Sequence, residues 1–231
     1  MAKLKFRAFH NNIEISASAL LGILIFIVSV FLFGLIGHEF VGERENTFDD
    51  RAFEFFSANT PSYLIPVFKV ITFFGSRNFL IPAYIVLVLL LFFYYKKKAE
   101  AICVFITGVV TTFLSIGLKE VYQRVRPSMP LNDKLTNYSF PSGHTLSSMV
   151  FCAILISLIW LSSFRKIFKV LISILLLLTT FLIAISRIVL RDHFASDVMA
   201  GAFLGIACVI LFFWMWRRVV VRPSKFLSSM K

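Results

Sequence analysis

Residues 168–188 read FKVLISILLLLTTFLIAISRI, and this stretch decides the fold class. Its charged residues, Lys169 and Arg187, stand near its two ends. A helix of about 20 mostly apolar residues is long enough to cross the hydrocarbon core of a bilayer. The stretch therefore predicts a transmembrane helix.

Further apolar stretches of similar length lie along the chain, at 16–37, 78–95, 100–118, 143–161 and 198–216. The composition agrees with them, because 58% of the 231 residues are hydrophobic and the mean hydropathy is +0.85. A soluble domain of this size buries only part of its surface and has no place for so much apolar side chain. We therefore predict an all-α, polytopic membrane protein with six transmembrane helices, forming a single membrane-embedded domain over residues 1–231.

The segment 48–75 interrupts this pattern with prolines, a glycine and several charged residues. It predicts amphipathic or interfacial helices that lie on the membrane after the first span. The first span itself follows basic residues, as a signal peptide would. It is long for a signal peptide, however, and no small-residue cleavage site follows it, so we expect a retained anchor.

Six spans place both termini on one side of the membrane, and basic residues indicate which side. The segments on the side of the termini contain most of them: Lys3, Lys5, Arg7, Lys96, Lys97, Lys98, Arg165, Lys166, Lys169, Arg217, Arg218, Arg222, Lys225 and Lys231. Acidic residues there are limited to Glu14 and Glu100, whereas charges balance on the other side. The positive-inside rule then predicts that both termini are cytoplasmic in a multi-pass protein of the cell membrane. The Phe- and Ile-rich composition suggests that the cell is bacterial.

Composition also argues against a nucleic-acid-binding protein and against a disulfide framework or metal site built from cysteines. The formal net charge of +12 would suit a nucleic-acid partner, but membrane orientation accounts for the excess, so no nucleic acid is expected. Cys103, Cys152 and Cys208 lie inside apolar stretches, and an odd count there argues against a disulfide framework or a metal site. We expect them to be ordinary small apolar residues.

The first polar cluster, KEVYQRVRP at 119–127, follows the third span. If the helix continues, Lys119 and Arg126 are about two turns apart and share one face, which suits a phosphate. Pro127 disfavours helical geometry at Arg126 and predicts that the helix ends there. Two snorkelling charges near a helix end are the alternative interpretation.

The second cluster, PSGH at 141–144, enters the fourth span. Ser142 and Gly143 predict a helix N-terminus, whose free N–H groups and dipole bind anions. Gly143 allows close approach of a phosphate oxygen, and His144 stands in the first turn beside it. A plain helix cap with an interfacial histidine is the alternative.

The third cluster joins the fifth and sixth spans and contains Ser186, Arg187, His193 and Asp197. His193 and Asp197 share a face if they are helical. A carboxylate on one imidazole nitrogen fixes the tautomer and leaves the other nitrogen free as a base or nucleophile. Arg187 adds a fork of donors suited to phosphate. The alternative is that His193 and Asp197 are an ordinary solvent-exposed pair in a loop.

All three clusters fall on the outer side in the predicted topology. Ionisable groups at membrane depth are unfavourable and mark functional sites. Together they supply cations, two histidines and a carboxylate, the set that phosphoryl transfer requires. The neighbouring charges are expected to be rim charges, and two further histidines to be loop residues: Glu120, Arg124, Arg191 and Asp192, then His10 and His38.

These motifs resemble those of the type 2 phosphatidic acid phosphatase superfamily. Its signature Lys-x6-Arg-Pro, Pro-Ser-Gly-His and Ser-Arg-x5-His-x3-Asp matches Lys119–Pro127, Pro141–His144 and Ser186–Asp197 without substitution and in order. Three spaced motifs are far more specific than one. Within the superfamily, the chain looks most similar to the bacterial phosphatidylglycerophosphatase B and undecaprenyl pyrophosphate phosphatase group.

The resemblance implies a histidine mechanism that needs no metal and no cofactor. His193 would attack phosphorus and form a phosphohistidine while Asp197 orients it, and His144 would protonate the leaving oxygen and then activate water. The phosphoryl oxygens would be held by Lys119, Arg126, Ser142, Gly143 and Arg187. The implied substrate is a lipid phosphate in the bilayer, such as phosphatidylglycerol phosphate, undecaprenyl pyrophosphate or phosphatidate.

Other functions share some of these features. A phosphotransferase of the same superfamily would form the same phosphoenzyme and pass the phosphate to an alcohol. A transporter also contains buried charges, but here the polar clusters gather at one face and do not cross the midplane. A lipid-binding relative without activity would not need both histidines and the carboxylate. No motif indicates a protein partner.

Overall fold

The computed structural model describes residues 17–132 and 136–221, and within these ranges the chain forms helices and no strand. The α-helices are α1 (Ala17–Gly37), α2 (Thr47–Asn59), α3 (Ile65–Phe73), α4 (Arg77–Leu89), α5 (Lys98–Tyr122), α6 (Gly143–Leu161), α7 (Lys166–Val189) and α8 (Ala195–Trp216). Short π-helical segments over His38–Gly42, Leu90–Tyr94 and Arg217–Val221 extend α1, α4 and α8, and a 3₁₀ turn over Ser62–Leu64 precedes α3. His10 lies outside the described residues.

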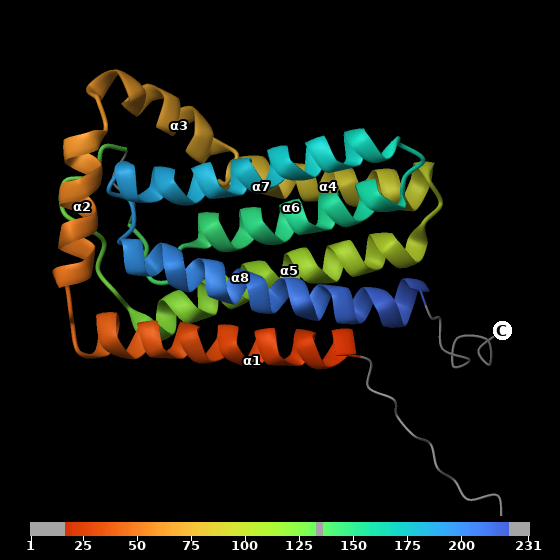
Figure 1. Cartoon of the computed structure of the whole chain (residues 1–231), viewed down its shortest axis with the longest axis horizontal. Coiled ribbons are helices and arrows are strands. Elements are labelled where there is room, and N and C mark those ends of the chain that lie inside the picture. Colours follow the sequence, from red (N-terminus) through yellow and green to blue (C-terminus); the bar gives the residue numbers. More distant parts are fainter. Residues whose placement is uncertain (1–16, 133–135, 222–231) are drawn as a thin grey trace, which may run out of the picture.

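The long helices lie side by side in one bundle (Figure 1). In the part of the chain that the structure describes, six helical stretches are long and apolar enough to cross a membrane: Ala17–Gly42, Ser62–Tyr94, Lys98–Tyr122, Gly143–Leu161, Lys166–Val189 and Ala195–Val220. The prediction of an all-α, multi-pass membrane protein is therefore confirmed. The second stretch begins earlier than residue 78, because only a short turn separates α3 from α4.

The helices α2 and α3 lie at one end of the bundle, after the first span. α2 runs across that end, roughly perpendicular to the long helices, and α3 slants from it towards α7 (Figure 1). Pro61 and Pro66 explain the break between them, because proline is tolerated in the first turn of a helix but not in its interior. The predicted segment 48–75 thus forms short helices that cover one end of the bundle.

The centre of the bundle is formed where α6 and α8 pack against each other. Leu146 of α6 and Leu204 of α8 are buried there. The two helices approach closely, since a Cβ built at Gly201 of α8 would lie 2.6 Å from the carbonyl oxygen of Ser142. Small residues allow such contacts between membrane helices. The beginning of α6 is therefore held against the beginning of α8, which brings the second and third motifs together.

The outward sides of α1 and α7 are apolar and exposed, as lipid-facing surfaces are. They include Leu20, Leu24, Ile27, Phe31, Leu171, Ile174, Leu175, Leu178 and Phe181. The three cysteines lie inside the bundle instead: Cys103, Cys152 and Cys208 are buried, and none forms a disulfide. They are the ordinary small apolar residues that their sequence context predicts.

Candidate active site

The three polar motifs meet at the end of the bundle that α2 covers (Figure 1). α5 and α7 end there, and α6 and α8 begin there. The helix α5 ends at Tyr122, because Gln123 adopts a left-handed conformation with φ of 47° and donates its N–H to the carbonyl of Lys119 at 3.0 Å. The expectation that this helix continues to Arg126 is therefore wrong, and Lys119 and Arg126 do not share a helix face.

Lys119 and Arg126 come together because both bind the segment that precedes α6. Lys119 Nζ donates to the carbonyl oxygens of Tyr138 at 2.7 Å and Ser139 at 2.9 Å. Arg126 Nε donates to the carbonyl of Asn137 at 2.8 Å, and its Nη2 donates to the side-chain oxygen of the same residue at 2.8 Å. Oxygens of the segment before α6 thus accept hydrogen bonds from both cations.

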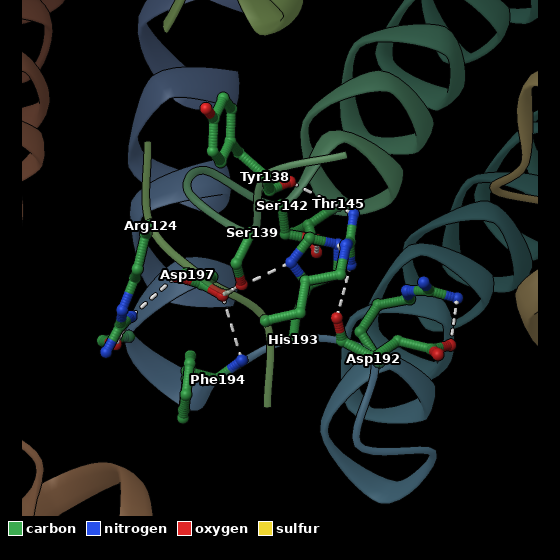
Figure 2. Close-up of polar contacts among 12 residues, drawn as sticks. Arg124, Tyr138, Ser139, Ser142, Thr145, Asp192, His193, Phe194 and Asp197 are labelled. Carbon is green, nitrogen blue, oxygen red and sulfur yellow. Dashed lines mark hydrogen bonds and ion pairs between the residues drawn. The ribbon is translucent and has the colours of Figure 1, made fainter. Parts of the chain in front are cut away.

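His193 lies in the turn before α8, between a carboxylate and a cation. Its Nδ1 is 3.4 Å from Oδ2 of Asp197, and its Nε2 is 3.2 Å from Nη1 of Arg126 (Figure 2). His193 and Asp197 are thus within reach of each other, as expected, although His193 itself precedes the helix, because α8 begins only at Ala195. Asp197 stands in the first turn of α8 and also accepts the N–H of Phe194 at 3.0 Å. These contacts favour the tautomer with hydrogen on Nδ1 and a lone pair on Nε2.

Asp197 is completely buried, and its carboxylate is held by more than His193. Arg124 Nη1 donates to its Oδ1 at 2.7 Å, and the Ser139 hydroxyl donates to its Oδ2 (Figure 2). Arg124 was expected to be a rim charge, and this expectation is wrong: it is only 8% exposed, and its guanidinium stacks 4.1 Å from the centre of the Phe194 ring. Hydrogen bonds from charged donors fix a carboxylate in both position and charge.

Arg124 also binds Asp49, which ties α2 to the site. Its Nη2 donates to Oδ2 of Asp49 at 2.8 Å. Asp49 is completely buried and accepts both the N–H and the hydroxyl of Ser196, at 2.8 and 2.6 Å. The sequence placed Asp49 among the surface charges of an interfacial helix. No local signal pairs it with residues 75 and 147 positions away.

Arg187 and Asp192 form a second buried pair behind His193. Arg187 Nη1 lies 2.9 Å from Oδ2 of Asp192 and also donates to the Thr72 hydroxyl of α3. Asp192 is 1% exposed, so the expectation that it is a rim charge is wrong. Arg187 is 2% exposed and is not among the residues that line the cavity described below. The pair therefore supports the turn that carries His193.

The two remaining rim candidates match their prediction. Glu120 is exposed, and Arg191 is partly exposed and donates to the hydroxyl of Ser57 on α2 at 2.9 Å. His38 was expected to be a loop residue, and this expectation is wrong: it is exposed, but it begins the π-helical segment His38–Gly42 that extends α1.

A cavity of about 450 Å³ opens in front of these groups. Of the predicted site residues, the cavity is lined by Lys119, Arg126, Gly143, His144 and His193. Ser142 and Asp197 lie directly behind the wall, where the Ser142 N–H donates to the carbonyl of Asp197 at 3.0 Å. The wall then continues along α4 and α5 with residues that sequence motifs did not indicate: Gly75, Ser76, Arg77, Asn78, Leu80, Ile81, Tyr84, Gly108, Thr111, Thr112, Ser115 and Ile116.

Burial and charge determine the protonation state of His193. Burial lowers its pKa well below the ordinary histidine value, and the positive charges of Arg126 and Lys119 lower it further. Burial lowers the pKa of Arg126 as well, but the guanidinium stays charged at neutral pH. His193 is therefore neutral at pH 7, with the lone pair of Nε2 directed towards the cavity.

The described ranges contain no group of three or more His, Cys, Asp or Glu side chains that could hold a metal ion. The positive charge beside His193 is supplied by Lys119 and Arg126 instead. The site can therefore position an anion, attack it with an imidazole nitrogen and stabilise developing negative charge with protein cations.

Comparisons with known proteins identify relatives of this chain. The sequence profile of the PAP2 superfamily matches residues 98–220, which include all three motifs. Phosphatidylglycerophosphatase B of Bacillus subtilis is 32% identical over 152 residues, covering 65% of this chain and 73% of that protein.

Two crystal structures have similar folds. The transmembrane PAP2-type phosphatidylglycerolphosphate phosphatase of Bacillus subtilis has a TM-score of 0.71 at 24% identity, covering 91% of this chain and 97% of that one. Aquifex aeolicus LpxE has a TM-score of 0.53 at 29% identity, covering 70% and 92%. The first of these likenesses, at its low identity, concerns the fold alone.

Proposed function

The chain belongs to the PAP2 superfamily and is a membrane lipid phosphatase, and from this premise we propose that it removes a terminal phosphate from a phospholipid or polyprenyl pyrophosphate through a phosphohistidine intermediate. The observation that carries the proposal is the position of His193. Its Nδ1 faces Asp197 at 3.4 Å, and its Nε2 faces the cavity beside Arg126 at 3.2 Å.

In the first step, Nε2 of His193 attacks phosphorus as the bond from phosphorus to the lipid oxygen breaks. Asp197 keeps the hydrogen on Nδ1 and stabilises the positive charge that forms on the ring. His144, on the cavity wall, gives its proton to the leaving oxygen.

In the second step, water attacks the phosphohistidine, and His144 takes a proton from that water. The bond from Nε2 to phosphorus breaks, orthophosphate leaves and His193 returns to its neutral form. Lys119, Arg126 and the amide of Gly143 bind the phosphoryl oxygens in both steps, while Ser142 and Arg187, behind the wall, support this binding. No step requires a metal ion.

We further propose that the site faces the outside of the cell and that both termini are cytoplasmic. The basic connections Lys96–Lys98 and Arg165–Lys169 lie at the end of the bundle opposite to α2 (Figure 1). Basic residues favour the cytoplasmic side of a membrane protein, which supports an outward-facing site. Such a site favours lipids displayed on the outer leaflet, such as undecaprenyl pyrophosphate.

The test is release of phosphate from phosphatidylglycerol phosphate, undecaprenyl pyrophosphate and phosphatidate by purified protein in detergent with EDTA. We expect wild type and His38→Ala to release phosphate and His193→Ala to release none; His38 is the matched control because it is an exposed histidine outside the cavity. Folded wild type that acts on none of the lipids would refute the proposal. Transfer to an added alcohol in preference to water would identify a phosphotransferase.

A further inference from the structure

Arg77, the first residue of α4, is a cation of the cavity that belongs to none of the three motifs. It is exposed, and no hydrogen bond or ion pair joins it to another described residue. The other cations of the site are engaged: Lys119 and Arg126 bind backbone carbonyls, and Arg124 and Arg187 bind buried carboxylates. Arg77 is therefore available to a ligand.

The turn that carries Arg77 touches the proposed proton donor. A Cβ built at Gly75 would lie 3.3 Å from Cδ2 of His144, so the backbone of the α3–α4 turn lies against that imidazole. Arg77 follows two residues later on the same turn. Because His144 protonates the leaving oxygen, Arg77 lies on the leaving-group side of the phosphorus, and His193 lies on the attacking side.

The charges of the cavity exceed what one phosphate needs. A phosphate monoester carries up to about two negative charges at neutral pH. Lys119 and Arg126 balance those two negative charges, so a single phosphate has no further charge for Arg77 to balance. None of the described residues that line the cavity is a carboxylate that could balance it. Asn78, beside Arg77 on the wall, adds an amide donor, and together they complement a second anionic group.

Along α4 and α5 the lining of the cavity combines apolar and hydroxyl side chains: Leu80, Ile81, Ile116, Thr111, Thr112 and Ser115. The apolar members suit the part of an amphiphile that follows its charged group. The cavity therefore contains the proposed nucleophile, the proposed acid, a further cation and apolar side chains.

We propose that Arg77 and Asn78 form a second anion subsite, which binds the phosphate that is not transferred in lipids carrying two phosphates. This phosphate is the inner phosphate of a polyprenyl diphosphate or the phosphodiester of a phosphatidylglycerol phosphate. The subsite rests on the proposed function, because it is defined relative to the leaving oxygen at His144. A lipid with a single phosphate does not reach it with an anion.

The test compares two pairs of substrates with matched tails: farnesyl diphosphate with farnesyl phosphate, and phosphatidylglycerol phosphate with phosphatidate. For Arg77→Gln, we expect kcat/KM for the two-phosphate lipid, relative to its one-phosphate partner, to fall about tenfold in at least one pair. Arg77→Lys should keep part of this ratio, since it keeps the charge. Arg51→Gln is the matched control, because it removes an exposed arginine of α2 that does not line the cavity.

The results separate this inference from the proposed function. A fall in the farnesyl pair identifies the inner phosphate of a diphosphate as the ligand, and a fall in the diacyl pair identifies the phosphodiester. An unchanged ratio in both pairs, or an equal loss on all four lipids, overturns the subsite and leaves the phosphatase intact. Wild type that hydrolyses none of the four overturns both. As an independent readout, inorganic pyrophosphate should inhibit phosphatidate hydrolysis more strongly than orthophosphate, and Arg77→Gln should remove the difference.

Discussion

Replacing Arg124 with Gln removes the one cation that Asp49 and Asp197 share. The guanidinium donates to Asp49 at 2.8 Å and to Asp197 at 2.7 Å, and both carboxylates are completely buried. Glutamine cannot reach both partners and carries no charge. The variant is therefore left with two buried carboxylates whose common counter-ion is gone, although the backbone around them is unchanged.

The size of the effect follows from burial. Removing one partner of a buried ion pair destabilises a protein by about 3–5 kcal/mol. For a domain of this size, that loss corresponds to a fall in Tm of roughly 6–20 °C. Asp197 also loses a hydrogen bond from a charged donor, which contributes about 1.5–3 kcal/mol, so kcat should fall about 10- to 150-fold if the loss affects the transition state.

The assay is thermal unfolding in detergent together with phosphate release below the Tm of the variant. Arg191→Gln is the control, since that arginine is partly exposed and its side chain hydrogen-bonds only the Ser57 hydroxyl among the described residues. The double variant Arg124→Gln/Asp49→Asn should regain part of the stability, because one uncompensated charge is removed with its partner. A single variant as stable as wild type, or losses that simply add in the double variant, would refute the reasoning.

The remaining predictions concern protonation, packing and metal. The acidic limb of the pH profile of kcat/KM should lie below about pH 6.5, because burial and nearby cations lower the pKa of His193, which is neutral and nucleophilic above that pKa and inactive below it. Arg126→Gln removes one of these cations and should move the limb to higher pH, whatever its effect on the maximal rate. Gly75→Ala should lower kcat, because the new Cβ would lie 2.6 Å from Cγ2 of Ile183 and 3.3 Å from the His144 ring, so the turn against His144 must shift, whereas Gly117→Ala meets no atom within 4 Å and should leave activity unchanged. Activity should survive EDTA and gain nothing from added magnesium, as a rate assay with both additions will show.

The parts of the fold that depend on local sequence were predicted correctly. Continuous apolar stretches such as 168–188 determine transmembrane helices by themselves, because the bilayer requires every backbone group within it to be satisfied inside the helix. Proline-containing residues 48–75 likewise predicted short helices that leave the bundle axis. The motifs then gave five of the residues that line the cavity, Lys119, Arg126, Gly143, His144 and His193, but not the part of the wall along α4 and α5.

The errors concern contacts between distant segments. Arg124 reads as a surface charge next to Arg126, and its burial depends on Asp49, which lies 75 positions earlier on another helix. The end of α5 was also misplaced, because Pro127 indicated Arg126 as the boundary, whereas Gln123, three residues earlier, adopts a left-handed conformation. Neither feature follows from spacing alone, since a charged residue is buried only when the fold supplies its partner.

The carbonyl groups that bind Lys119 and Arg126 have a consequence for turnover in the proposed mechanism. Tyr138, Ser139 and Asn137 present backbone oxygens to the two cations that the mechanism assigns to the phosphate, so the peptide chain and the phosphate compete for the same donors. We expect an arriving phosphate to take over some of these hydrogen bonds, and the carbonyl groups to accept them again when orthophosphate leaves. Release of the product would then leave neither cation without an acceptor.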